Sequence, residues 1–273
     1  MKKFSFILIL SATMLLAVSC SRDFVFVQMS DTQVGFWDQS EHYVVSDALL
    51  KDAVDAINLI HPALVIVTGD LINDKNNEEQ RAIFNKRMAE IDKGIPVWYT
   101  PGNHDIPEFN KENLEEYLSL VGYDRFSFVK KGCAFIGFDS CRIRSNDRDA
   151  EEEQFEWLKG ELAKVKGSKH VFLFCHCPLV RRNMEEKMNH DSFPVELRQK
   201  YLSLFLDSGV DALFSGHTHS GLNINLGSMQ SINAGPVARS FFGPSGINVV
   251  KVTEDGFESK FRTGKDILEH WPE

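Results

Sequence analysis

Short apolar runs alternate with segments of helical periodicity along the first part of the chain. Strands are expected at Phe24–Ser30, Ala63–Thr68 and Pro96–Thr100, because each is a nearly continuous run rich in β-forming residues. Between them, Ser46–Ile60 carries apolar residues at helical spacing, and Glu78–Lys93 is a charged helical stretch. This β-α-β-α-β order predicts a parallel sheet with right-handed crossovers.

The second part of the chain continues this alternation with one change. A short Lys-Lys-Gly turn separates Phe126–Val129 from Ala134–Phe138, which predicts an antiparallel pair. Glu151–Val165 has the apolar stripe of an amphipathic helix. The remaining expected elements are a helix near Val195–Leu206 and strands at Val171–Cys175, Ala212–Ser215, Leu222–Leu226, Ile247–Val252 and Phe257–Phe261. No repeat or linker divides the chain, so we expect one mixed α/β domain over residues 20–273.

The first nineteen residues have the pattern of an export signal. Met1-Lys2-Lys3 precedes an apolar run, Phe4–Val18, which is shorter than the ~20 residues that span a bilayer. The following Ser19-Cys20 completes a segment, Leu16-Ala17-Val18-Ser19-Cys20, that resembles a bacterial lipobox. This resemblance implies a lipoprotein-type signal over residues 1–19 and lipidation at Cys20. The lipid would anchor an exported protein in the bacterial cell envelope, as a periplasmic or surface lipoprotein. A plain signal peptide cut nearby is the alternative.

Four further cysteines, Cys133, Cys141, Cys175 and Cys177, follow in the exported part of the chain. Disulfides are permitted in exported proteins, but the spacing of these residues implies no disulfide framework. We therefore expect buried free thiols.

Composition and charge narrow the class of protein. With 43% hydrophobic residues, 25% charged residues and 21 Phe, the chain can form a sizeable soluble core. Acidic residues outnumber basic ones by 39 to 30, and the formal charge is −9. Because such a chain lacks the basic surface that nucleic-acid backbones require, the balance argues against general nucleic-acid binding.

Polar clusters follow five of the expected strands. They are Asp31-Thr32-Gln33, Gly69-Asp70, Gly102-Asn103-His104-Asp105, His176 and Gly216-His217-Thr218-His219. Each alone is compatible with an ordinary turn, but the carboxyl ends of strands form the ligand-binding edge of an open α/β sheet. Their oxygen and nitrogen donors suit Mn, Fe, Zn or a similar divalent ion rather than a cysteine-based zinc site.

The order of these motifs resembles the signature of the calcineurin-like metallophosphoesterases over nearly the whole mature chain. The resemblance implies a four-layer αββα sandwich, in which two mixed β-sheets pack face to face and helices lie outside. It also implies two divalent metal ions. One ion would be bound by Asp31, Gln33, Asp70 and His219, and the other by Asp70, Asn103, His176 and His217, with Asp70 bridging.

Gln33 departs from the usual family pattern, which has a histidine at this position. An amide oxygen donates less strongly than imidazole, so the first metal site is expected to be weaker or to select a harder ion. The same Asp-X-Gln pattern occurs in a subgroup that this sequence resembles elsewhere, the calcineurin-like phosphoesterase domain-containing phosphatases. We therefore interpret Gln33 as a subgroup trait.

The implied activity is phosphatase-type hydrolysis of phosphate esters by a metal-bridging hydroxide. His104 would stabilise or protonate the leaving oxygen. Asp105 would either orient His104 or cap the turn, and Asn73 occupies a position from which some relatives pair an aspartate with this histidine. The alternatives are a phosphodiesterase acting on nucleotides or phospholipid headgroups, and a non-catalytic binding protein with an impaired first metal site.

Three arginines are candidate substrate-binding residues. Arg181, Arg182 and Arg239 follow strand-end motifs and are candidates for contacts with a phosphorylated small molecule or a phosphoprotein. The acidic net charge is no obstacle to such a substrate, because two divalent ions would reverse the sign of the charge locally.

Overall fold

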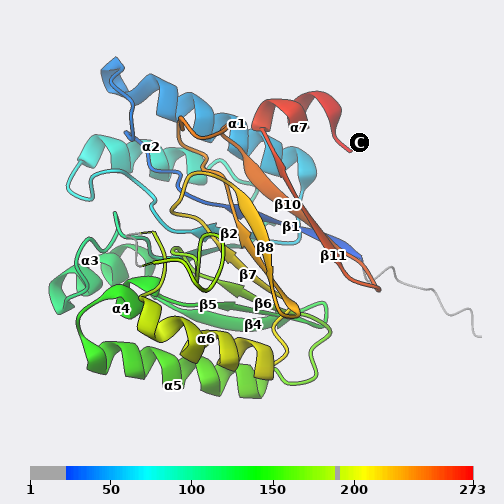
Figure 1. Ribbon diagram of the computed structural model, residues 1–273. Coiled ribbons are helices and arrows are strands. Elements are labelled where there is room, and N and C mark those ends of the chain that lie inside the picture. Colours follow the sequence, from blue (N-terminus) through cyan, green and yellow to red (C-terminus); the bar gives the residue numbers. More distant parts are fainter. Residues whose placement is uncertain (1–22, 188–190, 273) are drawn as a thin grey trace, which may run out of the picture.

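Two β-sheets lie face to face, with helices on their outer sides (Figure 1). The computed structural model describes residues 23–187 and 191–272. The first sheet has the strand order β11-β10-β1-β2-β3, and the second has the order β4-β5-β6-β7-β9-β8. Both sheets contain parallel and antiparallel pairs, which confirms the expected sandwich of two mixed sheets flanked by helices.

The strands agree closely with the expected ones. In the first sheet they are β1 (Phe24–Met29), β2 (Val65–Thr68), β3 (Val97–Thr100), β10 (Ile247–Val252) and β11 (Phe257–Arg262). In the second sheet they are β4 (Phe126–Lys130), β5 (Cys133–Gly137), β6 (Val171–Phe174), β7 (Ala212–Ser215), β8 (Leu222–Leu226) and β9 (Met229–Asn233). The expected antiparallel pair is β4 with β5, and β9 is a strand that the sequence analysis missed.

The helices are α1 (Val44–Ile60), α2 (Glu78–Met88), α3 (Lys111–Val121), α4 (Ser140–Arg144), α5 (Arg148–Lys164), α6 (Val195–Asp207) and α7 (Gly264–His270), with a short 3-10 turn, η1, at Glu41–Tyr43. Helices α1 and α7 lie on the outer side of the first sheet, and α5 and α6 cover the second (Figure 1). The sequence analysis did not predict α3, α4 or α7.

Strand β1 shows how the apolar pattern builds these layers. Its residues Phe24 and Phe26 face the second sheet, whereas Val27 and Met29 pack in the cluster beneath α1. The Phe26 ring lies between 5.3 and 6.0 Å, centroid to centroid, from four phenylalanines of the second sheet, Phe135, Phe172, Phe174 and Phe214. Because side chains alternate along a strand, β1 can contribute to both apolar layers at once.

Hydrogen bonds between the sheets align the ends of their parallel strands. The Gln28 amide donates to the Ser215 carbonyl at 3.0 Å, and His176 Nδ1 donates to the Thr68 carbonyl at 2.8 Å. The carboxyl ends of β1, β2, β6 and β7 therefore meet at one edge of the sandwich.

None of the described helices is both long and apolar enough to cross a membrane. The predicted signal over residues 1–19 and the predicted lipidation site Cys20 lie outside the described residues. The four cysteines Cys133, Cys141, Cys175 and Cys177 are free and buried, as expected.

Candidate metal centre and active site

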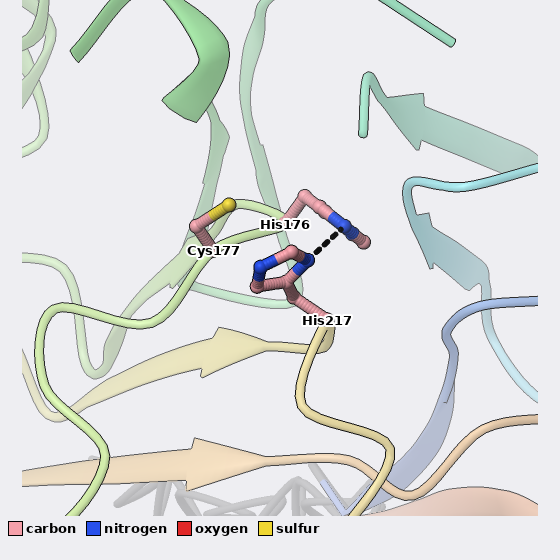
Figure 2. A group of neighbouring side chains, drawn as sticks. All are labelled: His176, Cys177 and His217. Carbon is pink, nitrogen blue, oxygen red and sulfur yellow. Dashed lines mark hydrogen bonds between the residues drawn. The ribbon is translucent and has the colours of Figure 1, made fainter. Parts of the chain in front are cut away.

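His176 is the hub of one group of predicted metal ligands. Its Nδ1 faces a carbonyl and must carry the proton, which leaves Nε2 as the nitrogen available to a ligand. This Nε2 lies 3.1 Å from Asn103 Oδ1, 3.2 Å from His217 Nδ1 and 3.2 Å from Asp70 Oδ2. Figure 2 shows the rings of His176 and His217 turned toward each other. Four side chains from separate loops thus converge on one point.

A second group lies directly beside the first. His219 Nε2 is 3.2 Å from Asp31 Oδ1, and oxygens of Asp31 and Asp70 lie within 4.8 Å of each other and of a His176 ring nitrogen. The Asp31 carboxylate is further held by the His217 backbone N–H and by the Ser30 hydroxyl. Asp70 therefore stands between the two groups, as a bridging ligand would.

Gln33 provides a test of whether this site fits a metal ion. Its side chain is only 1% exposed, and its Oε1 accepts no hydrogen bond from any described residue. A buried oxygen without a partner costs about 1–3 kcal/mol, so such atoms are rare unless something else satisfies them. A bound cation would satisfy it, and a buried amide oxygen together with carboxylates and imidazoles is a donor set that fits the predicted ion.

Five of the seven predicted ligands have left-handed backbone conformations. The φ angles are +49° at Asp31, +33° at Gln33, +54° at Asp70, +70° at His217 and +53° at His219. Residues other than glycine rarely adopt such angles, and they cluster at functional sites where the surrounding structure enforces them. The backbone at these loops is shaped to turn the side chains inward.

Gly102 is required by the same packing. A Cβ atom at this position would lie 2.2 Å from Asp70 Oδ1 and 2.3 Å from the Asp70 backbone nitrogen. The motif glycine thus allows the loop after β3 to approach the Asp70 carboxylate, the predicted bridging ligand.

The carboxyl groups of the centre have lowered pKa values, whereas its imidazoles have raised ones. Burial opposes the charged form of Asp31 and Asp70, but the neighbouring imidazoles outweigh it and hold the pKa of both carboxyls below its usual range. Burial likewise opposes protonation of His176 and His219, yet the adjacent carboxylates raise the pKa of both. The carboxylates are therefore ionised and ready to bind a cation, whereas a cation must displace protons from the imidazoles.

His104 lies beside the centre and is fixed at two points. Its backbone N–H donates to Asp70 Oδ1 at 2.7 Å, and its Nδ1 donates to the Asn73 backbone carbonyl at 2.6 Å. Some relatives pair an aspartate at position 73 with this histidine; here the contact is made by the main-chain carbonyl of Asn73 and does not depend on the Asn73 side chain. Nε2 is left as the nitrogen that can exchange a proton.

The Asp105 side chain makes the hydrogen bonds expected of a residue that caps the turn. Its carboxylate accepts hydrogen bonds from the backbone N–H groups of Asp70, Leu71 and Gly102, at 2.8, 3.0 and 2.8 Å. Burial, together with the nearby Asp70 charge, raises the pKa of Asp105 to about 7. These hydrogen bonds join the loops that follow β2 and β3. The expectation that Asp105 orients His104 stays a prediction.

A cavity of about 950 Å³ opens beside these groups. Asn103, His104 and His217 form one part of its wall, and Arg144 of α4 forms another. Carboxylates also line it, namely Asp74, Glu108, Asp147 and Asp191. The cavity provides room next to the candidate centre for a substrate larger than phosphate.

None of the three predicted substrate-binding arginines lines this cavity. Arg181 binds Asp191 at 2.8 Å, the backbone N–H of Arg182 donates to Glu186, and Arg239 lies over the Phe241 ring. Arg144, which the sequence analysis overlooked, is on the wall instead. The signal was its place after β5, at the edge where the other strands carry their motifs.

A comparison of the chain with models of known protein families identifies its family. The model of the calcineurin-like phosphoesterase family matches residues 24–221, and the chain belongs to this family. It is a metallophosphoesterase, an enzyme of phosphate-ester hydrolysis in a dimetal-dependent family.

Two curated relatives and one solved structure illustrate the similarity. The serine/threonine-protein phosphatase CPPED1 of Mus musculus is 28% identical over 72% of this chain and 69% of its own length. The probable glycerophosphodiester phosphodiesterase GpdQ of Arcobacter nitrofigilis is 30% identical over 71% of each chain. A dimetal phosphatase from Danio rerio has the same fold, with a TM-score of 0.68 and 19% identity over 88% of this chain and 96% of its own.

Proposed function

We propose that this protein is a two-metal phosphomonoesterase. The observation that carries the proposal is the pair of adjoining donor groups that share Asp70. The Gln33 Oε1 atom, which is buried and accepts no hydrogen bond from any described residue, supports it. Asp31, Gln33, Asp70 and His219 would hold one ion, and Asp70, Asn103, His176 and His217 the other. When bound, two divalent ions lower the pKa of a water and neutralise phosphate oxygens.

His104 is the proposed general acid. Its Nδ1 is fixed on the Asn73 carbonyl, so its Nε2 is the atom that can protonate a leaving oxygen. The ring lines the cavity together with Asn103 and His217, where the organic part of a substrate would lie. General acid catalysis of this kind contributes about 10²- to 10⁴-fold to a rate.

The proposed substrates are phosphorylated small molecules or phosphoproteins. A named protein phosphatase among the relatives supports this choice. A phosphodiesterase is the second candidate, because a relative of 30% identity is named a glycerophosphodiester phosphodiesterase. The buried Gln33 oxygen argues against the third candidate, a binding protein that has lost its first metal.

An exported, lipid-anchored location completes the proposal. It rests on the Lys2-Lys3 start, the apolar run and Cys20 in the sequence. The chain enters β1 at Phe24, and the ligand loop begins after Met29, about 20 Å further along at the rise of a β-strand. An anchor before β1 would therefore join the molecule at the end away from the site. Loss of the protein from the membrane fraction in Cys20→Ser tests this, and unchanged fractionation contradicts it.

The activity is tested with an aryl phosphate monoester and a bis-aryl phosphate diester, after chelation and after addition of Mn²⁺, Fe²⁺ or Zn²⁺. We expect metal-dependent turnover, stronger on the monoester, that falls at least about 100-fold in Asp70→Asn and in His104→Ala. Asp55→Asn and His42→Ala, which alter partly or well exposed side chains outside the site, serve as matched controls. Full activity in both site variants would overturn the proposal.

A further inference from the structure

Arg144 is a cation in the cavity wall that the family motifs do not include. We propose that its guanidinium binds a terminal phosphoryl oxygen of the substrate and so makes the site selective for phosphomonoester dianions over diesters. The inference rests on the proposed function and adds the substrate class that the metal ligands alone do not define.

The position of Arg144 follows from the chain after β5. Asp139 caps α4 by accepting a hydrogen bond from the Cys141 backbone N–H, and the short helix ends at Arg144 on the cavity wall. Asn103, His104 and His217 line the same cavity. Arg144 thus shares the substrate space with the proposed general acid and two proposed metal ligands.

Cys177 brings the guanidinium close to the centre. Its fully buried side chain directly follows His176, and its Sγ accepts a hydrogen bond from Arg144 Nη1 at 3.0 Å. The same sulfur lies within 4.8 Å of ring nitrogens of His176 and His217. Figure 2 shows these three side chains together. One sulfur atom therefore separates the guanidinium from two proposed metal ligands.

The contact with sulfur orients Arg144, and the Asp191 carboxylate of the same cavity interacts electrostatically with the guanidinium. A thiol is a weak acceptor, whereas a guanidinium carries five N–H donors in a planar fork. Cys177 is itself held in place, because its backbone N–H donates to Ser140 Oγ at 3.0 Å. The arrangement matches a positioning thiol behind an anion-binding arginine.

Two other cationic side chains near Arg144 or in the same cavity, Arg142 and Lys75, form ion pairs with carboxylates. Arg142, two residues earlier on α4, binds Asp124 at 2.9 Å and Glu153 at 2.7 Å. Lys75, which also lines the cavity, is paired with Glu116. These carboxylate pairs tie Arg142 and Lys75 into the fold.

The chemistry of the two ester classes explains the expected selectivity. A monoester dianion has three terminal oxygens and two negative charges, whereas a diester has two terminal oxygens and one charge. A guanidinium beside the centre gains a charge-assisted hydrogen bond to the additional oxygen of the monoester, and the diester offers no equivalent. Removing the guanidinium should therefore weaken the binding of monoesters more than that of diesters.

The test compares Arg144→Gln and Arg144→Lys with Arg148→Gln. Arg148 is four residues further along the chain and pairs with Glu196 at the surface, so it is a matched control. We expect kcat/KM for the monoester to fall about 10- to 100-fold in Arg144→Gln, less in Arg144→Lys, and not at all in Arg148→Gln. The diester rate should change less than about 3-fold, and calorimetric titration should show inorganic phosphate binding weakened as much as monoester turnover.

Equal losses on both esters, or unchanged phosphate binding in Arg144→Gln, would overturn the inference. If the wild-type protein hydrolyses neither ester, the proposed function fails by itself, and the phosphate titration still decides the role of Arg144. A Cys177→Ala exchange adds a second readout. If Cys177 acts by positioning Arg144, the double variant should lose no more monoester activity than Arg144→Gln alone.

Discussion

The two sheets contribute different chemistry to the same edge of the molecule. Loops of the first sheet bring the oxygen donors Asp31, Gln33, Asp70 and Asn103, whereas loops of the second bring the nitrogen donors His176, His217 and His219. The oxygen side has ionised carboxylates, and the nitrogen side has imidazoles whose pKa values the carboxylates raise. Neither sheet alone holds a complete set of ligands, so the centre depends on how the sheets pack.

The largest expected effect comes from loosening that packing. Phe26→Ala removes the ring that contacts four phenylalanines of the opposite sheet, and we expect the free energy of unfolding to fall by about 3–5 kcal/mol. Urea denaturation of the metal-free protein measures the change. Phe242→Ala, at a side chain that is 77% exposed, should change stability by less than about 0.5 kcal/mol. Equal effects of the two exchanges would show that the aromatic layer does not hold the sheets together.

The next prediction concerns a change that disturbs only the oxygen donors of the first sheet. Gly102→Ala places a Cβ atom against Asp70, and we expect phosphatase activity to fall about 100-fold as the bridging carboxylate is displaced, with helix and sheet content unchanged. Gly94→Ala, a position with open space around it, is the matched control. Activity within a factor of two of the wild type in Gly102→Ala would contradict the described contact between the two loops.

A smaller effect is expected at Gln33. Gln33→Ala removes one neutral oxygen ligand, and we expect affinity for the weaker-bound ion to fall about 10-fold, whereas Gln33→His should strengthen the binding of Zn²⁺. Competition with a metal-binding dye measures both affinities, and Gln199→Ala, on the outer helix α6, is the control. Unchanged metal affinity in Gln33→Ala would mean that the buried oxygen is not a ligand.

The last prediction distinguishes the two sides by the pH dependence of metal affinity. Because the raised pKa values of His176 and His219 stabilise bound protons, metal binding must release them, and apparent affinity should fall as pH decreases, by about 10-fold per unit for each proton displaced. The carboxylates have lowered pKa values and should add no dependence between pH 5 and 7. Metal affinity that is constant over this interval would contradict the described imidazole–carboxylate pairs.

The sequence predicted, for a local reason, that the proposed oxygen and nitrogen donors lie at one edge of the sandwich, and the structure brings them together there. Each ligand directly follows an apolar strand, and parallel strands bring their carboxyl ends to one edge, so linear position was enough. The pairing of strands that are far apart in the sequence could not be predicted from such local signals. Strand β10 returns to lie antiparallel to β1 across more than two hundred residues, and nothing in either segment specifies the other.

Elements and roles without a periodic or motif signal escaped prediction. Helix α4 has five residues, too few for a repeat, so Arg144 at its end went unnoticed. Strand β9 reads MQSIN, a mixture of polar and apolar residues. The roles of Asp105 and Asn73 depend on backbone groups that the turn brings near, which side-chain identity does not reveal.

Metal stoichiometry tests the central claim, a centre shared between two sheets through Asp70, most directly. We predict that the purified, metal-loaded wild-type protein contains two divalent ions per chain by elemental analysis, and that Asp70→Asn contains fewer than one. Two ions retained in Asp70→Asn, or fewer than one in a wild-type protein that keeps full turnover after chelation, would contradict it.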